Sequence, residues 1–234
     1  MTTTVGLIDA TDYLDDNVYA NDEDSQFMNE ALVNGPNAFL PSYDPGGALE
    51  LETGQWSLIG VAMRIGEDSD DSHFGFYGGQ LAYRPSTPLG PGAYRILVAG
   101  SSEDILDPDG NASERRTALL LSFDQRLGPG LGAFLRVGWQ NETADAGYRA
   151  IYSGGLDIGG IGWSRERDNI GLAYAYLDAG SGGLRRSQVA ELYYRWVFDD
   201  RLALTADLQY MRDEPHAGVA TAGLILGSRF VVEF

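Results

Sequence analysis

The chain has 234 residues, of which 44% are hydrophobic, and it carries a formal net charge of -18. No stretch approaches the roughly 20 consecutive apolar residues that a membrane-spanning helix requires, so a helical membrane protein is excluded. The negative charge argues against a nucleic-acid partner, because binding polyanions depends on basic side chains. Cysteine is absent, which excludes disulfides and cysteine-ligated metal sites, and we expect no cofactor and no metal.

Short segments of alternating hydrophobicity follow one another along the chain, separated by clusters of Gly, Pro, Asp and Asn. Such a succession is typical of membrane strands. We predict twelve strands, near Thr4 to Asp9, Ala48 to Thr53, Trp56 to Arg64, Gly75 to Arg84, Tyr94 to Gly100, Thr117 to Arg126, Leu131 to Gln140, Arg149 to Ile158, Ile170 to Leu177, Val189 to Phe198, Leu202 to Met211 and Val219 to Phe234.

Each predicted strand has one apolar and one polar face. In the eleventh strand, Leu204 and Leu208 alternate with Asp207 and Gln209. A soluble β-sandwich also alternates, but here Tyr and Trp recur near the strand ends, where the aromatic girdles of a membrane barrel lie. Long polar connections also alternate with abrupt turns, as in outer loops and periplasmic turns. The sequence therefore predicts an all-β fold, a transmembrane antiparallel up-and-down β-barrel of the bacterial outer-membrane type.

A long acidic stretch, residues 9–47, separates the first two predicted strands. Three interpretations are open: a solvated loop, a loop that folds inward and narrows a pore, or a site for a hard cation such as Ca²⁺, although the spacing does not match an EF-hand. The candidate residues of a constriction loop are Asp12, Asp15, Asp16, Asp22, Glu23 and Asp24.

Three short motifs near the start of the chain carry a family resemblance: GLIDATDY at 6–13, YANDE at 19–23 and QFMN at 26–29. Further similarity lies in 130–140, 152–156, 191–195 and 204–210. With these residues the sequence resembles the carbohydrate-selective porin family of the OprB type over most of its length. The resemblance implies a passive channel in the bacterial outer membrane for small hydrophilic solutes, carbohydrates in particular.

Members of that family look like 16-stranded barrels, whereas this chain has about twelve predicted strands in a single barrel domain, 1–234, without the part that would precede Gly6. Either the chain closes as a narrower barrel of about twelve strands, or it is a C-terminal portion whose first edge another chain or a further segment covers, because unpaired backbone groups facing lipid cost several kcal/mol each. The expected surroundings are the lipid bilayer and lipopolysaccharide, and a homotrimer is one assembly that stays open.

A passive pore needs a polar lumen whose narrowest ring supplies hydrogen bonds and charge. Arginine suits sugar hydroxyls and carboxylates. The opposing interpretation is that the charged side chains of the lumen pair with one another across strands and hold the shape of the lumen. The candidates on the predicted lumen face are Arg64, Arg84, Arg95, Arg136, Arg149, Asp157, Glu191, Arg195, Asp207 and Arg229.

Two other functions fit a barrel. A lumen filled by paired arginines and carboxylates would make a non-conducting structural or scaffold barrel. An outer-membrane lipase would use Ser and His on the outer wall, but His73 and His216 occupy loops without a recognisable partner pattern for acyl transfer. We therefore expect no enzymatic activity and assign no catalytic residue.

Overall fold

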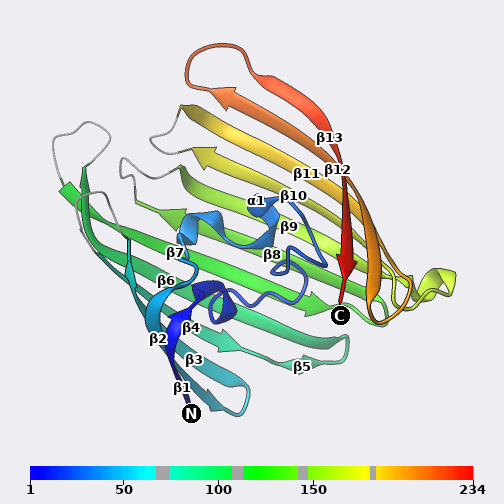
Figure 1. The fold of residues 1–234 in the computed structure, drawn as a ribbon, viewed down its shortest axis with the longest axis horizontal. Coiled ribbons are helices and arrows are strands. Elements are labelled where there is room, and N and C mark those ends of the chain that lie inside the picture. The colour runs from blue at the N-terminus through cyan, green and yellow to red at the C-terminus, as the bar shows by residue number, and fades with distance from the viewer. Residues whose placement is uncertain (67–73, 107–112, 142–146, 180–182, 234) are drawn as a thin grey trace.

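The computed structural model describes residues 1–66, 74–106, 113–141, 147–179 and 183–233 (Figure 1). Twelve strands form one antiparallel sheet in which each strand pairs with the next along the chain, and a thirteenth, two-residue strand, β5, pairs with β6. The strands are β1 (Thr2–Ile8), β2 (Asp44–Thr53), β3 (Trp56–Ile65), β4 (Phe74–Tyr83), β5 (Ser86–Thr87), β6 (Gly90–Leu106), β7 (Ser113–Arg126), β8 (Leu131–Gln140), β9 (Tyr148–Gly159), β10 (Asn169–Ala179), β11 (Leu184–Val197), β12 (Leu202–Pro215) and β13 (Thr221–Val232).

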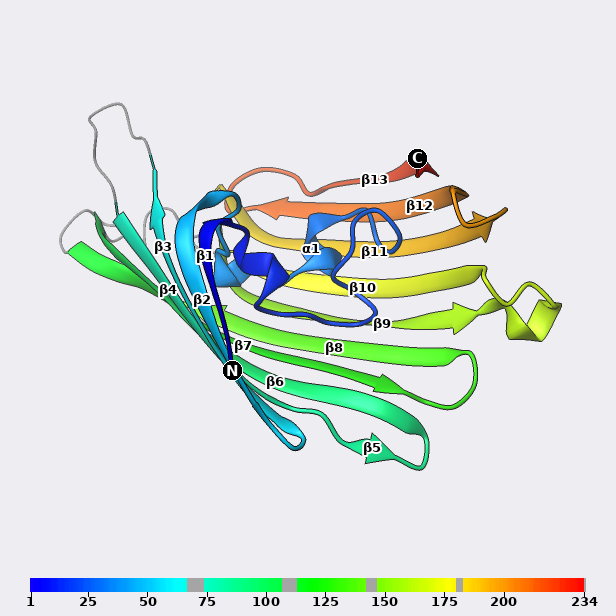
Figure 2. The same cartoon turned by 60° about the horizontal axis from the view of Figure 1, so that its bottom comes forward.

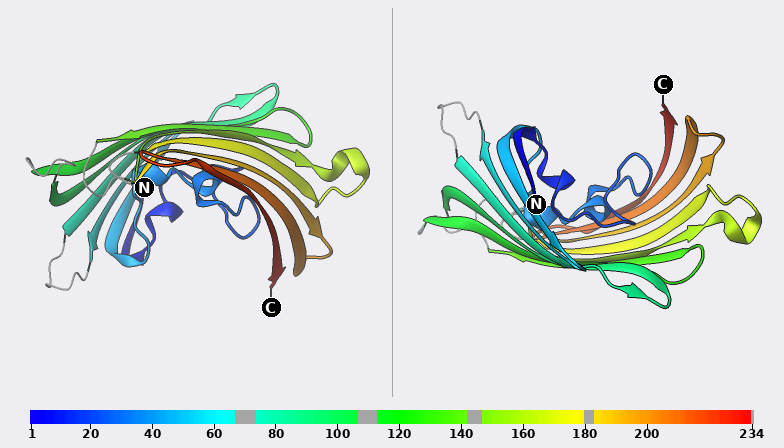
Figure 3. Two further views of the ribbon diagram at one scale, coloured as in Figure 1. Left: turned by 90° about the horizontal axis from the view of Figure 1, so that it is seen from above. Right: turned by 90° about the horizontal axis from the view of Figure 1, so that it is seen from below.

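All twelve predicted strands are confirmed, and the short strand β5 is the one that the sequence did not predict. The sheet is open, because the described part of β1 pairs with β2 alone and that of β13 with β12 alone. Figure 3 shows a trough with the two chain ends apart. The closed twelve-stranded barrel that the sequence left open as one alternative is therefore wrong for this chain. Closure of a barrel requires its first and last strands to pair, and the described residues of β1 and β13 do not pair with one another in this sheet.

The two faces of the sheet differ sharply in chemistry. On the outer face five leucines are neighbours across five consecutive strands: Leu156, Leu172, Leu192, Leu208 and Leu226. All five are exposed in the isolated chain. Because side chains alternate along a strand, their neighbours in sequence point inward, and the inward residues of β11 and β12 include buried Glu191 and Asp207. None of the described helices is long and apolar enough to cross a membrane.

Residues 9–43, which we call the inward loop, connect β1 to β2 and lie within the concave face of the sheet (Figures 2 and 3). The loop ends at 43 rather than 47, because Asp44 already pairs with Ile8. Its helices are η1 (Ala10–Asp12), α1 (Glu30–Val33) and η2 (Pro36–Ala38), and a further helix, η3 (Gly160–Trp163), lies between β9 and β10. The core of the molecule therefore lies between this loop and the inner face of the sheet.

Local sequence explains how the loop turns and how it approaches the sheet. The Asp9 carboxylate accepts the Thr11 N–H at 2.8 Å at the start of η1, and the Asn29 side chain accepts the Ala31 N–H at 3.1 Å at the start of α1. A Cβ on Gly132 would lie 2.1 Å from the ring of Tyr19, so only glycine lets this ring lie against β8.

Candidate functional site

The inward loop is held to the sheet by arginines of the inner wall. The Arg136 Nε and an Asp15 carboxylate oxygen lie 2.8 Å apart, and both side chains are fully buried. The guanidinium also donates to the backbone carbonyls of Leu32 at 3.0 Å and Val33 at 3.1 Å, and to that of Ala20. One side chain on β8 thus holds three separated parts of the loop.

A second ion-pair cluster lies around Asp16. Its carboxylate accepts from Arg95 Nε at 2.6 Å and from Arg84 at 2.8 Å. Arg95 also pairs with Asp124 on β7 at 2.6 Å, and both of these side chains are buried. The loop thereby contributes one negative group between two arginines of the wall, and Asp124 balances the second charge.

Acidification should loosen this cluster. Burial alone would raise the pKa of Asp16, but the Arg95 and Arg84 guanidiniums outweigh it and hold this pKa below its ordinary value of 3.8. A group with a lowered folded-state pKa contributes stability that is complete above its unfolded value and is lost as the pH falls through the folded one. Amide hydrogen exchange of the inward loop should therefore rise on acidification below about pH 4. In the variant Asp16→Asn this increase in hydrogen exchange should be smaller than in the wild type. Equal pH profiles of the two proteins would show that Asp16 is not the group responsible.

At the other end of the loop, the wall supplies a carboxylate as well as a guanidinium. Buried Glu191 accepts the backbone N–H groups of Met28 at 2.6 Å and Asn29 at 3.0 Å. Arg229 on β13 donates to the carbonyls of Glu23 and, at 2.9 Å, Gln26. A carboxylate on β11 and a guanidinium on β13 thus hold the loop through its backbone.

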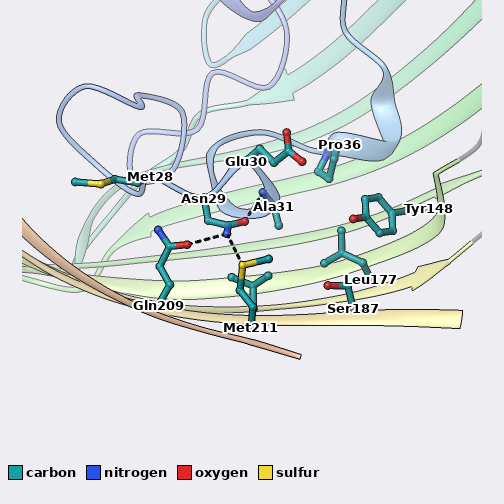
Figure 4. Close-up of a pocket in the computed structure, with 11 residues that line it drawn as sticks. Met28, Asn29, Glu30, Ala31, Pro36, Tyr148, Leu177, Ser187, Gln209 and Met211 are labelled. Carbon is teal, nitrogen blue, oxygen red and sulfur yellow. Dashed lines mark hydrogen bonds between the residues drawn. The ribbon is translucent and has the colours of Figure 1, made fainter. Parts of the chain in front are cut away.

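A cavity of about 360 Å³ lies between α1 and strands β9 to β12 (Figure 4). Glu30, Tyr148, Ser187 and Gln209 bring polar groups to it, and Leu177, Val189 and Met211 form an apolar floor. The Asn29 amide donates to Gln209 Oε1 at 3.0 Å and thereby joins the loop to the wall beside the cavity. Hydroxyl, amide and carboxylate groups next to an aromatic ring suit a small polar solute.

The structure places most predicted lumen residues on the inner face, but with different surroundings. Arg95 and Arg136 are buried beneath the loop, which matches the interpretation that wall charges pair and hold shape. Six further predicted lumen residues also lie on the inner face: Arg84, Asp157, Glu191, Arg195, Asp207 and Arg229.

Two predicted lumen residues are wrong. Arg64 shares the outer face with exposed Leu58, because β3 is apolar on both faces and its inner face packs on the loop. Its alternation therefore did not reveal which parity points inward. Arg149 follows the outer face because a β-bulge opposite Asp178 and Ala179 shifts the register, and it pairs with Asp178 at 2.5 Å.

The acidic candidates of the loop divide into two groups. Asp15 and Asp16 bind the wall arginines, whereas Asp22 accepts the N–H groups of Asp24 and Ser25 within its own turn. Asp12, Glu23 and Asp24 remain at least partly exposed. The described residues include no group of three or more His, Cys, Asp or Glu side chains placed to hold a metal ion.

Sequence reasoning missed several residues that complete the site. Gln80 accepts the Asp15 N–H at 2.8 Å, and the Asn17 amide donates to Ser122 Oγ at 3.2 Å. Asp124 could have been found, because it shares the inward parity of β7 with Ser122. Asn17 had no comparable signal, since nothing in a loop sequence shows which wall residue it will meet.

Comparison with known proteins identifies the family. The sequence matches, over residues 1–234, the family described as carbohydrate-selective porin, OprB family. The chain belongs to the OprB family. A protein of Aquifex aeolicus (strain VF5), described only as uncharacterized, is 30% identical over 213 residues, which are 89% of this chain and 58% of that protein. The chain thus spans less than two thirds of the length of this relative.

A solved structure supports the fold independently. The high-pH structure of Pseudomonas putida OprB superposes with a TM-score of 0.83 at 15% sequence identity, covering 99% of this chain and 69% of that one. At this identity the likeness shows the fold alone. The open meander of this chain is therefore the fold of a large part of an OprB-family barrel.

Proposed function

We propose that the protein is an outer-membrane porin through which small hydrophilic solutes, carbohydrates above all, diffuse passively. Membership of a porin family supports the class, and porins are typically channels rather than enzymes. The observation that carries the proposal is the inward loop, which runs along a polar inner face and is held there by Arg136, Arg95 and Glu191. A fixed loop inside a barrel narrows the lumen without closing it, which gives selectivity by size and hydrogen bonding.

The membrane setting requires partners for the sheet edges. The free edges of β1 and β13 would expose unpaired backbone groups to hydrocarbon, which costs several kcal/mol for each group. In the bilayer, further strands outside the described sheet should therefore pair with both edges. The five outward leucines then face lipid, and the inward loop faces the aqueous path.

The decisive experiment is ion conductance of the protein in a planar bilayer, with sugars added as blockers. We expect Tyr148→Ala to weaken the block by glucose or maltose about fivefold, because a hydrogen bond and a ring contact in the cavity are lost. Tyr152→Ala is the matched control, since Tyr152 lies on the outer face of the same strand and is 43% exposed. Equal effects of both variants would show that the cavity does not contact the solute.

A non-conducting scaffold is the second candidate, and one observation favours it. The loop covers Arg95 and Arg136 completely, so that part of the interior is filled by paired charges rather than open. Correctly inserted protein that shows no unitary conductance at several salts and voltages would reject the porin and support the scaffold.

A further inference from the structure

Four arginines lie together on the outer face at the ends of β9, β11 and β12, where the longer connections emerge. We call Arg149, Arg185, Arg186 and Arg212 the outer arginine patch. In the sheet, Asp178 pairs with Arg186, and Arg186 pairs with Glu214, so these three side chains share one face. That face is the outer one, because exposed Leu192 on β11 and Tyr210 on β12 have the same parity as Arg186 and Glu214.

Two register irregularities enlarge the patch. One, opposite Asp178 and Ala179, directs Arg149 to Asp178. The other, between Leu184 and Arg186, brings Arg185 to Glu214 beside its neighbour. β-Bulges re-aim side chains in this way at the ends of strands. Without them, consecutive residues such as Arg185 and Arg186 would point to opposite faces.

Glu214 organises the patch. Its carboxylate accepts from Arg185 at 2.6 Å, from Arg186 at 2.7 Å and from Arg212 at 2.9 Å. The Glu214 side chain is only 7% exposed, whereas those of Arg185 and Arg212 are 60% and 44% exposed. A guanidinium carries five N–H donors, so each arginine keeps donors that point away from the shared carboxylate. Among the described residues, the buried Nε of Arg186 has no hydrogen-bond partner.

The charge of the patch is unbalanced. Glu214 contributes one negative charge against the three positive charges of Arg185, Arg186 and Arg212, which leaves an excess of two among these four residues. This excess stands out in a chain whose formal net charge is -18. An anion of more than one negative charge therefore complements this surface.

The height of the patch relative to the membrane indicates the kind of anion. Tyr152, Tyr176 and Tyr210 lie on the same outer face, and Arg212 follows Tyr210 by two residues. Two residues of a strand span about 7 Å. Outward tyrosines mark the boundary between hydrocarbon and headgroups, so the arginines just beyond them lie at headgroup level.

We propose that the outer arginine patch binds the phosphate groups of a phosphorylated glycolipid in the outer leaflet, of the kind that anchors lipopolysaccharide. This proposal rests on the outer-membrane setting of the proposed function. Guanidiniums bind phosphate oxygens in bidentate pairs, and Glu214 pre-positions three of them. The acyl chains of the same lipid would lie along the leucine-rich outer face below.

Binding of lipid A to the full-length protein in phosphatidylcholine nanodiscs tests the proposal. The triple variant Arg185→Gln, Arg186→Gln, Arg212→Gln should bind about a hundredfold more weakly, because each arginine near the lipid surface contributes about 1 kcal/mol. The matched control removes three arginines at the opposite end of the sheet, Arg165→Gln, Arg167→Gln, Arg201→Gln, and should bind as the wild type does. The corresponding triple lysine variant keeps the charge and should lose only part of the affinity.

Several outcomes would overturn the proposal. They are unchanged binding in the folded triple glutamine variant, equal loss in the control, or equal binding of the same glycolipid without phosphates. Displacement of lipid A by inorganic phosphate at matched concentration would indicate a phosphate site rather than a lipid site. Self-association that the triple glutamine variant abolishes would instead assign the patch to a second copy of the chain. Bilayer conductance, measured in parallel, should be unchanged in the variant, so failure of the porin proposal would be recognised separately.

Discussion

Replacing Arg136 by methionine should lower the free energy of unfolding by about 3–5 kcal/mol, because it leaves the Asp15 carboxylate buried without its partner. Three carbonyls of the inward loop lose their donor at the same time. The loop should therefore detach locally and single-channel current should become larger and noisier. Chemical unfolding in detergent micelles measures the first effect, and planar-bilayer recording measures the second.

Two further variants make this prediction specific. Arg84→Met removes an arginine whose side chain is 36% exposed, and such an ion pair contributes about 0–1 kcal/mol. The double variant Asp15→Asn, Arg136→Met should recover part of the lost stability, since the uncompensated charge is gone. If Arg136→Met and Arg84→Met were equally stable and conducted alike, Arg136 would not be the residue that holds the loop.

Arginine in place of Leu208 should destabilise the protein in a bilayer by about 2–4 kcal/mol, as a charge at the lipid-facing midplane does. Leu208 lies between Leu192 and Leu226 in the outward leucine row, near the middle of β12. The loss should be measured by reversible unfolding from lipid vesicles. In micelles, where detergent and water reach the side chain more easily, the loss should be smaller.

Gln188→Arg provides the matched control for this substitution. Gln188 lies on the same outer face, opposite Tyr176 and near the aromatic girdle, where an arginine costs about 0–1 kcal/mol. A depth-dependent difference between the two sites is expected only for a strand that spans a membrane. Equal, small losses at both positions would show that the leucine row does not face hydrocarbon.

The division of the strands into faces was predictable where the two faces differ in polarity. In β12, Leu204 and Leu208 alternate with Asp207 and Gln209, and the structure places them on opposite faces. In β3 both faces are apolar, because Ile59 and Val61 pack on the inward loop, and the parity of Arg64 was misassigned. A hydrophobic pattern cannot distinguish a residue that faces lipid from one that faces a buried loop.

By itself, the sequence determined the number, order and approximate bounds of the long strands, because the period-two alternation and the turn residues between segments are local properties. Its motifs also indicated the family, which the comparison confirmed. Only the tertiary structure decided that the sheet stays open, that the inward loop buries Arg95 and Arg136, and that bulges bring Arg149 and Arg185 to the outer face. These outcomes depend on whether distant strands meet, on contacts between residues far apart in sequence and on one-residue shifts of register, none of which a local pattern encodes.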